Sequence, residues 1–158
     1  GLVGGRKTDS AWERAIAEVG MSGVRLEGEV MVLAPAAGAS MATSDLVEAS
    51  GLRLAAVVDL NGGVLLDPTR TAAAMSLLSE LEASAYFCNV FIQVAACDSI
   101  AQAIIHHFGS PRERVVVRMT GNRPPEGCAL LSVSGFLVEE RLDYPGPRRD
   151  SRRRNRPP

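Results

Sequence analysis

The sequence predicts an α/β domain of the flavodoxin-like, doubly wound kind, with a mainly parallel sheet of five strands and helices on both faces. Short apolar runs alternate with segments of helical length along most of the chain. The connections between them are short, which implies right-handed βαβ units. Aromatic residues make up only 4% of the chain, so its core consists mainly of Ala, Val, Leu and Ile. That composition suits helices packed closely on a parallel sheet.

Each predicted strand is a short continuous apolar run, which is typical of a strand covered on both faces. The five predicted strands are 30–34, 54–60, 86–91, 114–119 and 136–138. The predicted helices that connect them are 41–50, 68–83, 97–108 and 124–134. Another helix is expected over 11–19, where Trp12, Ile16 and Val19 share one face. The sequence does not decide whether this helix projects as an arm or packs on the domain.

The length of 158 residues fits one domain with short extensions. We divide the chain into an N-terminal arm with one helix (1–23), the α/β domain (24–143) and a basic Pro/Arg-rich tail (144–158). Residues 146–158 contain six Arg and one Asp and no apolar side chain to bury, so we expect a flexible, solvated end. The alternative is that the tail contacts RNA, an acidic lipid surface or an acidic protein.

No apolar run reaches the roughly 18 to 20 residues that span a bilayer, so no transmembrane segment is expected. Cys88, Cys97 and Cys128 show no paired spacing, which favours free thiols in a reducing compartment and burial as small hydrophobic side chains. The chain begins at Gly1 without a Met, which suggests that a leader has been removed.

Ligands of doubly wound domains bind at the C-terminal ends of the strands, where helix N-termini attract anions. Four segments lie at such ends, namely 35–45, 59–63, 89–98 and 115–122. His106 and His107 lie late in a predicted helix and point about 100° apart, so we expect surface positions rather than a shared ligand. No metal-binding spacing, P-loop or Ser/His/Asp set is present, and no metal or cofactor is predicted.

Taken in order, these four segments resemble motifs of succinyl-CoA synthetase (succinate–CoA ligase) β subunits. The family motifs are NGAGLAMATMD, LDVGGG, NIFGGI followed by CD, and VVVRLEGTN. The resemblance runs from about residue 24 to about residue 142 and covers the C-terminal, CoA-ligase-type domain of that subunit. The family residues that this chain retains include Gly38, Met41, Ala42, Thr43, Asp45, Gly62, Gly63, Asn89, Phe91, Cys97, Asp98, Arg118, Gly121 and Asn122.

The resemblance implies a domain from a larger machine. In that family an N-terminal ATP-grasp domain of the β subunit binds the nucleotide, and an α subunit carries the phosphorylated histidine and binds CoA. The C-terminal β domain contacts the α subunit and binds succinate through the Asn of NGAG and the glycines of GGI. The present sequence has no segment that resembles the ATP-grasp domain or the Gly-His-Ala-Gly setting of the phosphorylated histidine.

The departures from the family fall on the substrate-binding positions. Pro35 replaces the Asn of NGAG, so neither a side-chain amide nor a backbone N–H is available there. Ile92, Gln93 and Val94 replace Gly-Gly-Ile, and a β-branched residue at 92 disfavours positive φ and close approach of an anion. Ala96 replaces the following Arg. We therefore predict that Pro35, Ile92, Gln93 and Val94 form a degenerate substrate site.

These observations favour a non-catalytic β-like domain that serves as a structural or assembly subunit of a larger complex. By analogy with the parent enzyme of eukaryotes, we expect the mitochondrial matrix side, with protein subunits as partners and an α-subunit-like chain among the candidates. One alternative is a split β subunit of an acyl-CoA ligase that works with separate α and ATP-grasp chains. Another is a small binding module for CoA, a nucleotide or RNA.

Overall fold

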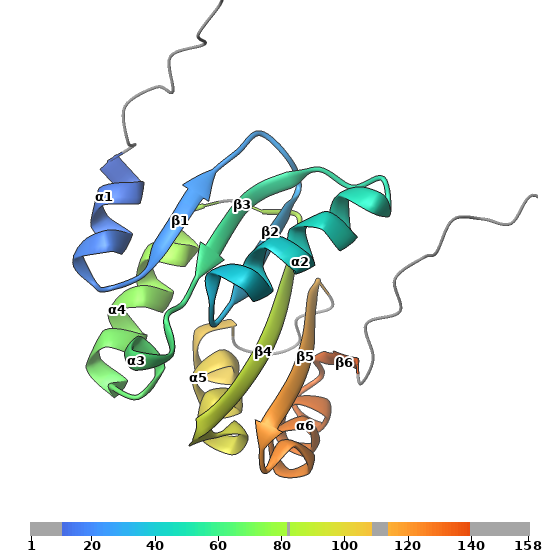
Figure 1. Ribbon diagram of the computed structural model, residues 1–158. Helices are drawn as coiled ribbons and strands as arrows, with labels where there is room; N and C mark the ends of the chain where they lie inside the picture. The colour runs from blue at the N-terminus through green and yellow to red at the C-terminus, as the bar shows by residue number, and fades with distance from the viewer. Residues whose placement is uncertain (1–10, 82, 109–113, 140–158) are drawn as a thin grey trace, which may run out of the picture.

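The computed structural model describes residues 11–81, 83–108 and 114–139, apart from a few side chains within these ranges (Figure 1). One sheet of six strands has the order β1-β3-β2-β4-β5-β6. The strands are β1 (Ser22–Arg25), β2 (Val30–Ala34), β3 (Leu54–Asp59), β4 (Ala85–Ala96), β5 (Val115–Asn122) and β6 (Leu137–Glu139). The helices are α1 (Ala11–Glu18), α2 (Ala37–Ala49), α3 (Gly62–Leu65), α4 (Pro68–Ser79), α5 (Cys97–Phe108) and α6 (Pro124–Val133).

The five strands from β2 to β6 are parallel, and their order is that of flavodoxin-like domains. The predicted fold class is therefore confirmed, but the predicted strand count of five was one too low. The additional strand, β1, pairs antiparallel with β3 at the edge of the sheet. It escaped prediction because it has only four residues, none of them buried, and so lacks the apolar run that marks the other strands.

The direction of each crossover determines which face its helix covers. The chain moves in one direction along the sheet from β2 to β3 and in the opposite direction from β3 through β4 and β5 to β6. Right-handed crossovers therefore place α2 on one face and α4, α5 and α6 on the other (Figure 1). The larger core cluster lies on the second face and includes Met31, Val58, Leu78 and Ile104. A smaller cluster beneath α2 includes Val32 and Val47.

Helix α1 packs on the domain. Trp12 and Ile16 are buried in the larger core, and the indole Nε1 of Trp12 donates a 2.8 Å hydrogen bond to the carbonyl of Leu77 in α4. A carboxylate oxygen of Glu13 accepts from the backbone N–H of Arg25 at 3.0 Å and ties the helix to β1. The question that the sequence left open for this helix is thus answered by its contacts.

The three cysteines are free thiols, as predicted. Cys88 and Cys97 are buried, and Cys128 is half-buried. Burial raises the pKa of the Cys88 thiol from its ordinary 9.0 to about 12. Within the described ranges, no helix has the length and apolar character needed to cross a membrane. The predicted basic tail, 144–158, lies outside the described residues.

Candidate functional site

The first family segment forms a tight junction between β2 and α2. Only Pro35 and Ala36 separate the strand from a helix that begins at Ala37, four residues earlier than predicted. Ala36 is the N-cap and provides no side-chain hydrogen bond. Because Ala cannot cap and Pro has no N–H, this junction offers an anion only the backbone amides of the first turn. Gly38 is exposed, with no other atom near the place where a Cβ would lie.

The second segment forms a turn organised by the contacts of Asn61. Asn61 has a positive φ of 47° and caps α3, since its side-chain oxygen accepts from the Gly63 N–H at 3.3 Å. Its side-chain amide donates to the carbonyl of Gly20 at 3.2 Å, and its own N–H donates to Asp59 at 2.9 Å. Gly62 and Gly63 form the first turn of this four-residue helix. The cluster therefore shapes the turn after β3 and connects it to the turn after α1.

The third segment differs most from the prediction. We expected the strand to end at residue 91 and a loop to follow, but β4 continues through Ala96, and α5 begins at Cys97 as predicted. Ile92 pairs with Gly121, and Ala96 pairs with Asn122 after an irregularity in the register. A Gly-Gly pair would favour a turn, whereas Ile and Val favour extended backbone and a paired strand. Ile92 and Val94 are compatible with the extended backbone of β4 at these positions.

The start of α5 is occupied by the chain's own groups. Asp98 lies in the first turn, accepts from the Ser99 N–H at 3.0 Å and pairs with Arg123 at 3.2 Å. Cys97 is fully buried, and a Cβ placed on Gly127 of α6 would lie 2.8 Å from its carbonyl group. Burial, followed by the nearby Cys128, Asp98 and Glu126, raises the pKa of the Cys97 thiol. An anion at this helix end would compete with Asp98 for the same positive potential.

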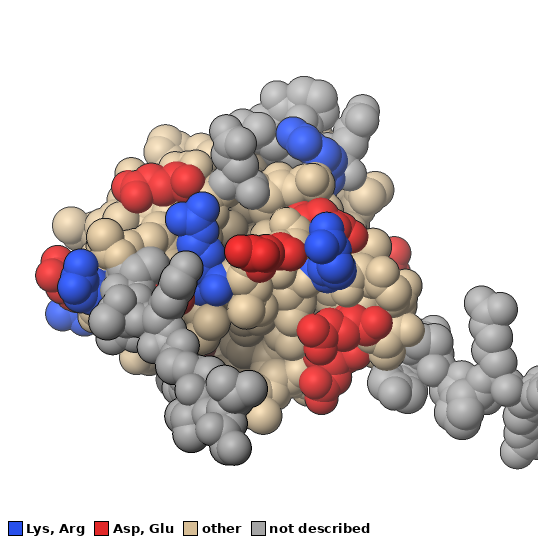
Figure 2. Space-filling view, turned by 90° about the horizontal axis from the view of Figure 1, so that it is seen from above, with Lys and Arg blue, Asp and Glu red and all other residues tan. Residues whose placement is uncertain are grey.

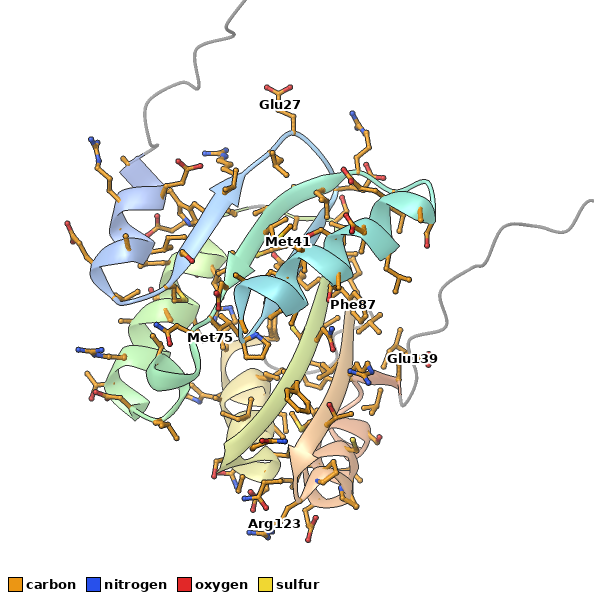
Figure 3. All side chains as sticks on the ribbon, in the orientation of Figure 1. Glu27, Met41, Met75, Phe87, Arg123 and Glu139 are labelled. Atoms are coloured by element: carbon orange, nitrogen blue, oxygen red, sulfur yellow. The ribbon has the colours of Figure 1, made fainter. Side chains whose placement is uncertain are left out.

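The fourth segment turns from β5 into α6. Gly121 has a φ of 128°, and Arg123 adopts the left-handed conformation at the N-cap of α6 with a φ of 56°. Arg123 lies at the lower end of the molecule in Figure 3 and pairs with Glu126 at 3.5 Å as well as with Asp98. The retained Gly121 therefore serves the backbone of the turn, because the left-handed region is easily reached only by glycine. Asn122 is exposed and ends the strand.

The predicted substrate positions follow two neighbouring strands. The final register pair of β2 with β4 joins Leu33 to Cys88, so Pro35 lies two residues beyond this pair and Gln93 five. Gln93 is exposed, and the side chains of Ile92 and Val94 lie outside the described ones. Asp45 is exposed on α2, remote in sequence from the segment at β4.

Three other retained residues do meet, in a polar chain that crosses from α2 over β4 to β5. Asn89 is buried, with 6% of its surface exposed. Its side-chain amide donates to Thr43 Oγ1 at 2.7 Å, and its side-chain oxygen accepts from Arg118 Nη1 at 3.1 Å. Thr43 in turn donates to the carbonyl of Ala39 at 2.7 Å. In the sequence these residues were only motif matches; the missed signal was an Asn inside the apolar run 86–91.

A groove of about 910 Å³ lies between α4 and α5, and the sequence did not predict it. Met75 and Ile100 contribute apolar surface, and Thr71, His106 and His107 contribute polar groups. Both histidines lie in the last turn of α5, and the His107 ring packs edge-on against Phe108 with centroids 4.6 Å apart. No group of three metal-binding side chains occurs in the described part of the chain.

Charges of both signs alternate at the end of the sheet opposite to the junctions. Figure 2 shows this end from above, with acidic and basic side chains interspersed over the described surface. A surface that binds nucleic acid through phosphates is a continuous basic patch or stripe. The described part of this face has no such patch, so the RNA alternative gains no support from it.

Comparison with known proteins places this fold in a family. A β subunit of succinate–CoA ligase (subunit beta 2) from Archaeoglobus fulgidus is 35% identical over 119 residues, which is 75% of this chain and 31% of the relative. The corresponding subunit beta 2 of Streptomyces coelicolor is 34% identical over 148 residues, or 92% of this chain and 38% of the relative. The chain is homologous to the C-terminal region of succinate–CoA ligase β subunits. It spans about a third of the length of these relatives.

Solved structures agree on the fold. ATP citrate lyase of Methanosaeta concilii, a mutant determined with citryl-CoA, superimposes with a TM-score of 0.58 at 16% identity, covering 84% of this chain and 40% of that one. ATP citrate lyase from Methanothrix soehngenii, determined with citrate and coenzyme A, gives 0.57 at the same identity, with coverage of 84% and 42%. No protein-family model matches the sequence. The domain therefore has a CoA-ligase-like fold, and its sequence is that of a diverged β-subunit relative.

Proposed function

We propose that this chain is a non-catalytic, CoA-ligase-like domain that serves as a structural or assembly subunit of a larger protein complex. The observation that carries this proposal is the direct passage of β4 into α5 at Ala96–Cys97. An anion-binding junction needs open backbone amides at the helix N-terminus. Here Ile92 and Ala96 pair with Gly121 and Asn122 of β5, and the first turn already holds the ion pair between Asp98 and Arg123.

The junction at β2 supports the same proposal. Pro35 and Ala36 provide neither a side-chain donor nor a cap for α2, so neither residue can recognise a carboxylate through a polar side chain. At the other junctions, Asn61 and the retained Gly121 have positive φ values of 47° and 128°, and both serve turn geometry. These features support a domain that keeps the fold of its relatives without their substrate chemistry.

Succinate binding provides the first test. In ¹⁵N-HSQC titrations with succinate, we expect no saturable shift of the amides at the starts of α2 and α5, Ala37–Ser40 and Cys97–Ile100. A triple variant, Pro35→Asn with Ile92→Gly and Gln93→Gly, restores the family residues and is expected to gain such shifts. Dimethyl succinate, which has the same carbon chain without charge, is the matched control ligand. Saturable shifts of these junction amides when succinate is added to the unaltered chain would contradict the proposal.

A second candidate is a split β subunit that works with separate α and ATP-grasp chains. It is favoured by the 34–35% identity to β subunits of the ligase. Purification of the native chain separates the two candidates. Recovery in a complex that forms an acyl-CoA from ATP, CoA and an acid would establish the split enzyme and refute the structural role. The mitochondrial setting stays a prediction, and subcellular fractionation with an antibody against the chain tests it.

A further inference from the structure

Half of one sheet face has no described helix over it. Helix α2 contacts β2, β3 and one side of β4, whereas α5 and α6 lie behind β4 and β5 on the other face (Figure 1). The topology explains the gap, because only the crossover from β2 to β3 runs in the direction that puts its helix on the α2 face. We call the part of this face formed by β4, β5 and β6 the open face.

The strand register fixes which side chains share the open face. Since side chains alternate along a strand, every second residue belongs to it. The pairs Phe87–Val116, Asn89–Arg118 and Phe91–Thr120 join β4 to β5, and the pairs Val116–Leu137 and Arg118–Glu139 join β5 to β6. Arg118 therefore lies at the centre of this array. Its neighbours on the paired strands, Asn89 and Glu139, are polar, and most side chains two residues away along the strands are apolar. Phe91 and Leu137 are 53% and 52% exposed.

Arg118 has a partly buried guanidinium whose hydrogen-bonding capacity is hardly used. A guanidinium has five N–H donors, and here one nitrogen, Nη1, donates to Asn89. The Nε–H is buried without a partner, as is the hydroxyl of the neighbouring Thr120. Buried polar atoms without a partner are rare in folded proteins, and each requires an explanation such as a bound water or ligand.

The charge of Arg118 is also uncompensated by the described residues. None of their carboxylates forms an ion pair with Arg118. Glu139 is opposite in register but exposed, and it lies at the outer edge of the sheet in Figure 3. The family motif VVVRLEGTN has a Glu two residues after its Arg, on the same face of the strand, and this chain has Thr120 there. A partly buried charge without a counter-ion raises the free energy of the folded chain. Binding of an external anion beside Arg118 would therefore be favourable.

We propose that Arg118 is the centre of a carboxylate-binding site on the open face. A planar guanidinium donates two parallel hydrogen bonds to a carboxylate or a phosphate, and its single charge balances a carboxylate but not a phosphate dianion. The exposed ring of Phe91 and the exposed methyl groups of Leu137 flank the site and would contact an apolar group attached to the carboxylate. The carboxylate comes from a small organic acid or from an Asp or Glu of a partner protein. This site is distinct from the junctions at the ends of β2 and β4.

The site can be tested with the full chain by following the Nε–Hε signals of its arginines in ¹⁵N-HSQC spectra at low ionic strength. The probes are acetate, 3-methylbutanoate and inorganic phosphate. We expect a saturable shift of the Arg118 signal with millimolar 3-methylbutanoate, several-fold weaker binding of acetate and weaker binding still of phosphate. Arg53, which is exposed and pairs with Glu29 at 3.6 Å, is the internal control and should shift little. An Arg118 shift no larger than that of Arg53 would overturn the proposal.

Substitutions at Arg118 and Glu139 test separately the shape of the guanidinium, its charge and the effect of Glu139. Arg118→Gln should weaken acid binding at least tenfold, measured on the backbone amides of Asn89 and Thr120. Arg118→Lys keeps the positive charge and should weaken acid binding by a smaller factor. It also allows the test to be made if the Gln variant does not fold. Glu139→Gln should tighten binding a few-fold. If acid binds only after Glu139→Gln, the guanidinium is neutralised within the chain and the proposal is wrong.

A final comparison identifies the source of the carboxylate. If a partner protein supplies it, the native chain with Arg118→Glu loses a partner that both the unaltered chain and Arg53→Glu retain. If all three chains retain the same partners while the Nε–Hε titration shows acid binding, the ligand is a free acid. Either result supports a carboxylate site at Arg118. Loss of partners in neither variant, together with no titratable shift, would refute it.

Discussion

Gly127 and Gly38 provide a matched pair for testing how tightly the start of α5 is held. Both are helical glycines, so replacing either with Ala gains the same kind of backbone rigidity. Their surroundings differ. A Cβ at Gly38 would meet no other atom within 4 Å, whereas a Cβ at Gly127 would lie 2.5 Å from Met119 Sδ and 2.8 Å from the carbonyl C and O of Cys97.

The expected free energies follow from these distances. Ala is favoured over Gly by up to about 1 kcal/mol inside a helix, and by roughly half of that near the start of α2. The Met119 side chain can move away from a new Cβ, but the Cys97 carbonyl is backbone at the junction of β4 and α5. Overpacking against such a group costs about 1–3 kcal/mol. Gly127→Ala should therefore lower the free energy of unfolding by about 1–2 kcal/mol, while Gly38→Ala raises it by about 0.5 kcal/mol.

Urea denaturation followed by circular dichroism at 222 nm measures both variants. The midpoint should shift in opposite directions with an unchanged m-value. In thermal unfolding, a change of 1 kcal/mol corresponds to about 2–4 °C for a protein of this size. If Gly127→Ala is as stable as Gly38→Ala, the close packing of α6 on Cys97 is not present in solution. The start of α5 would then not be held closed by this packing.

Two further predictions concern a buried thiol and a turn. Cys88, whose pKa burial raises from 9.0 to about 12, stays protonated in the folded state while the unfolded thiol ionises, so stability falls as pH rises above 9. Between pH 8.5 and 10.5 the unaltered chain should lose about 2 kcal/mol more than Cys88→Ala, and equal losses in urea titrations would contradict the assignment. Asn61→Ala removes a cap and a side chain that tolerates positive φ, so it should lower the free energy of unfolding by about 1–3 kcal/mol. Asn61→Gly restores the φ freedom and should cost less in the same assay; a larger loss for Gly would show that the backbone is not the reason.

The sequence predicted the parallel core well because its strands contain apolar runs, and β2 is buried at every residue. Burial requires uninterrupted apolar runs such as 30–34, and such runs are visible without any structure. It failed at β1, where antiparallel pairing with β3 supplies hydrogen bonds but little burial. The residues of β1 do not themselves indicate a strand, because its pairing depends on β3, which lies about thirty residues further along the chain.

The site was predicted at the level of residues but not of geometry. Substitution of Gly-Gly by Ile92 and Gln93 predicted a changed junction, and a loop was expected where β4 continues to Ala96. Whether such residues form a loop or a strand depends on a neighbouring strand that can pair with them, and β5 provides it through Gly121 and Asn122. The link from Thr43 through Asn89 to Arg118 depends on the packing of α2 across β4, which no local pattern encodes.

The short outer strands of the sheet have a consequence for aggregation. β1 has four residues and β6 three, so the two edges offer few unpaired N–H and C=O groups to a strand of another molecule. Edge-to-edge growth of the sheet, the usual route from a parallel sheet to fibrils, is therefore disfavoured on its described edges. Contacts of this domain with other molecules are left to its faces, where side-chain chemistry selects the partner.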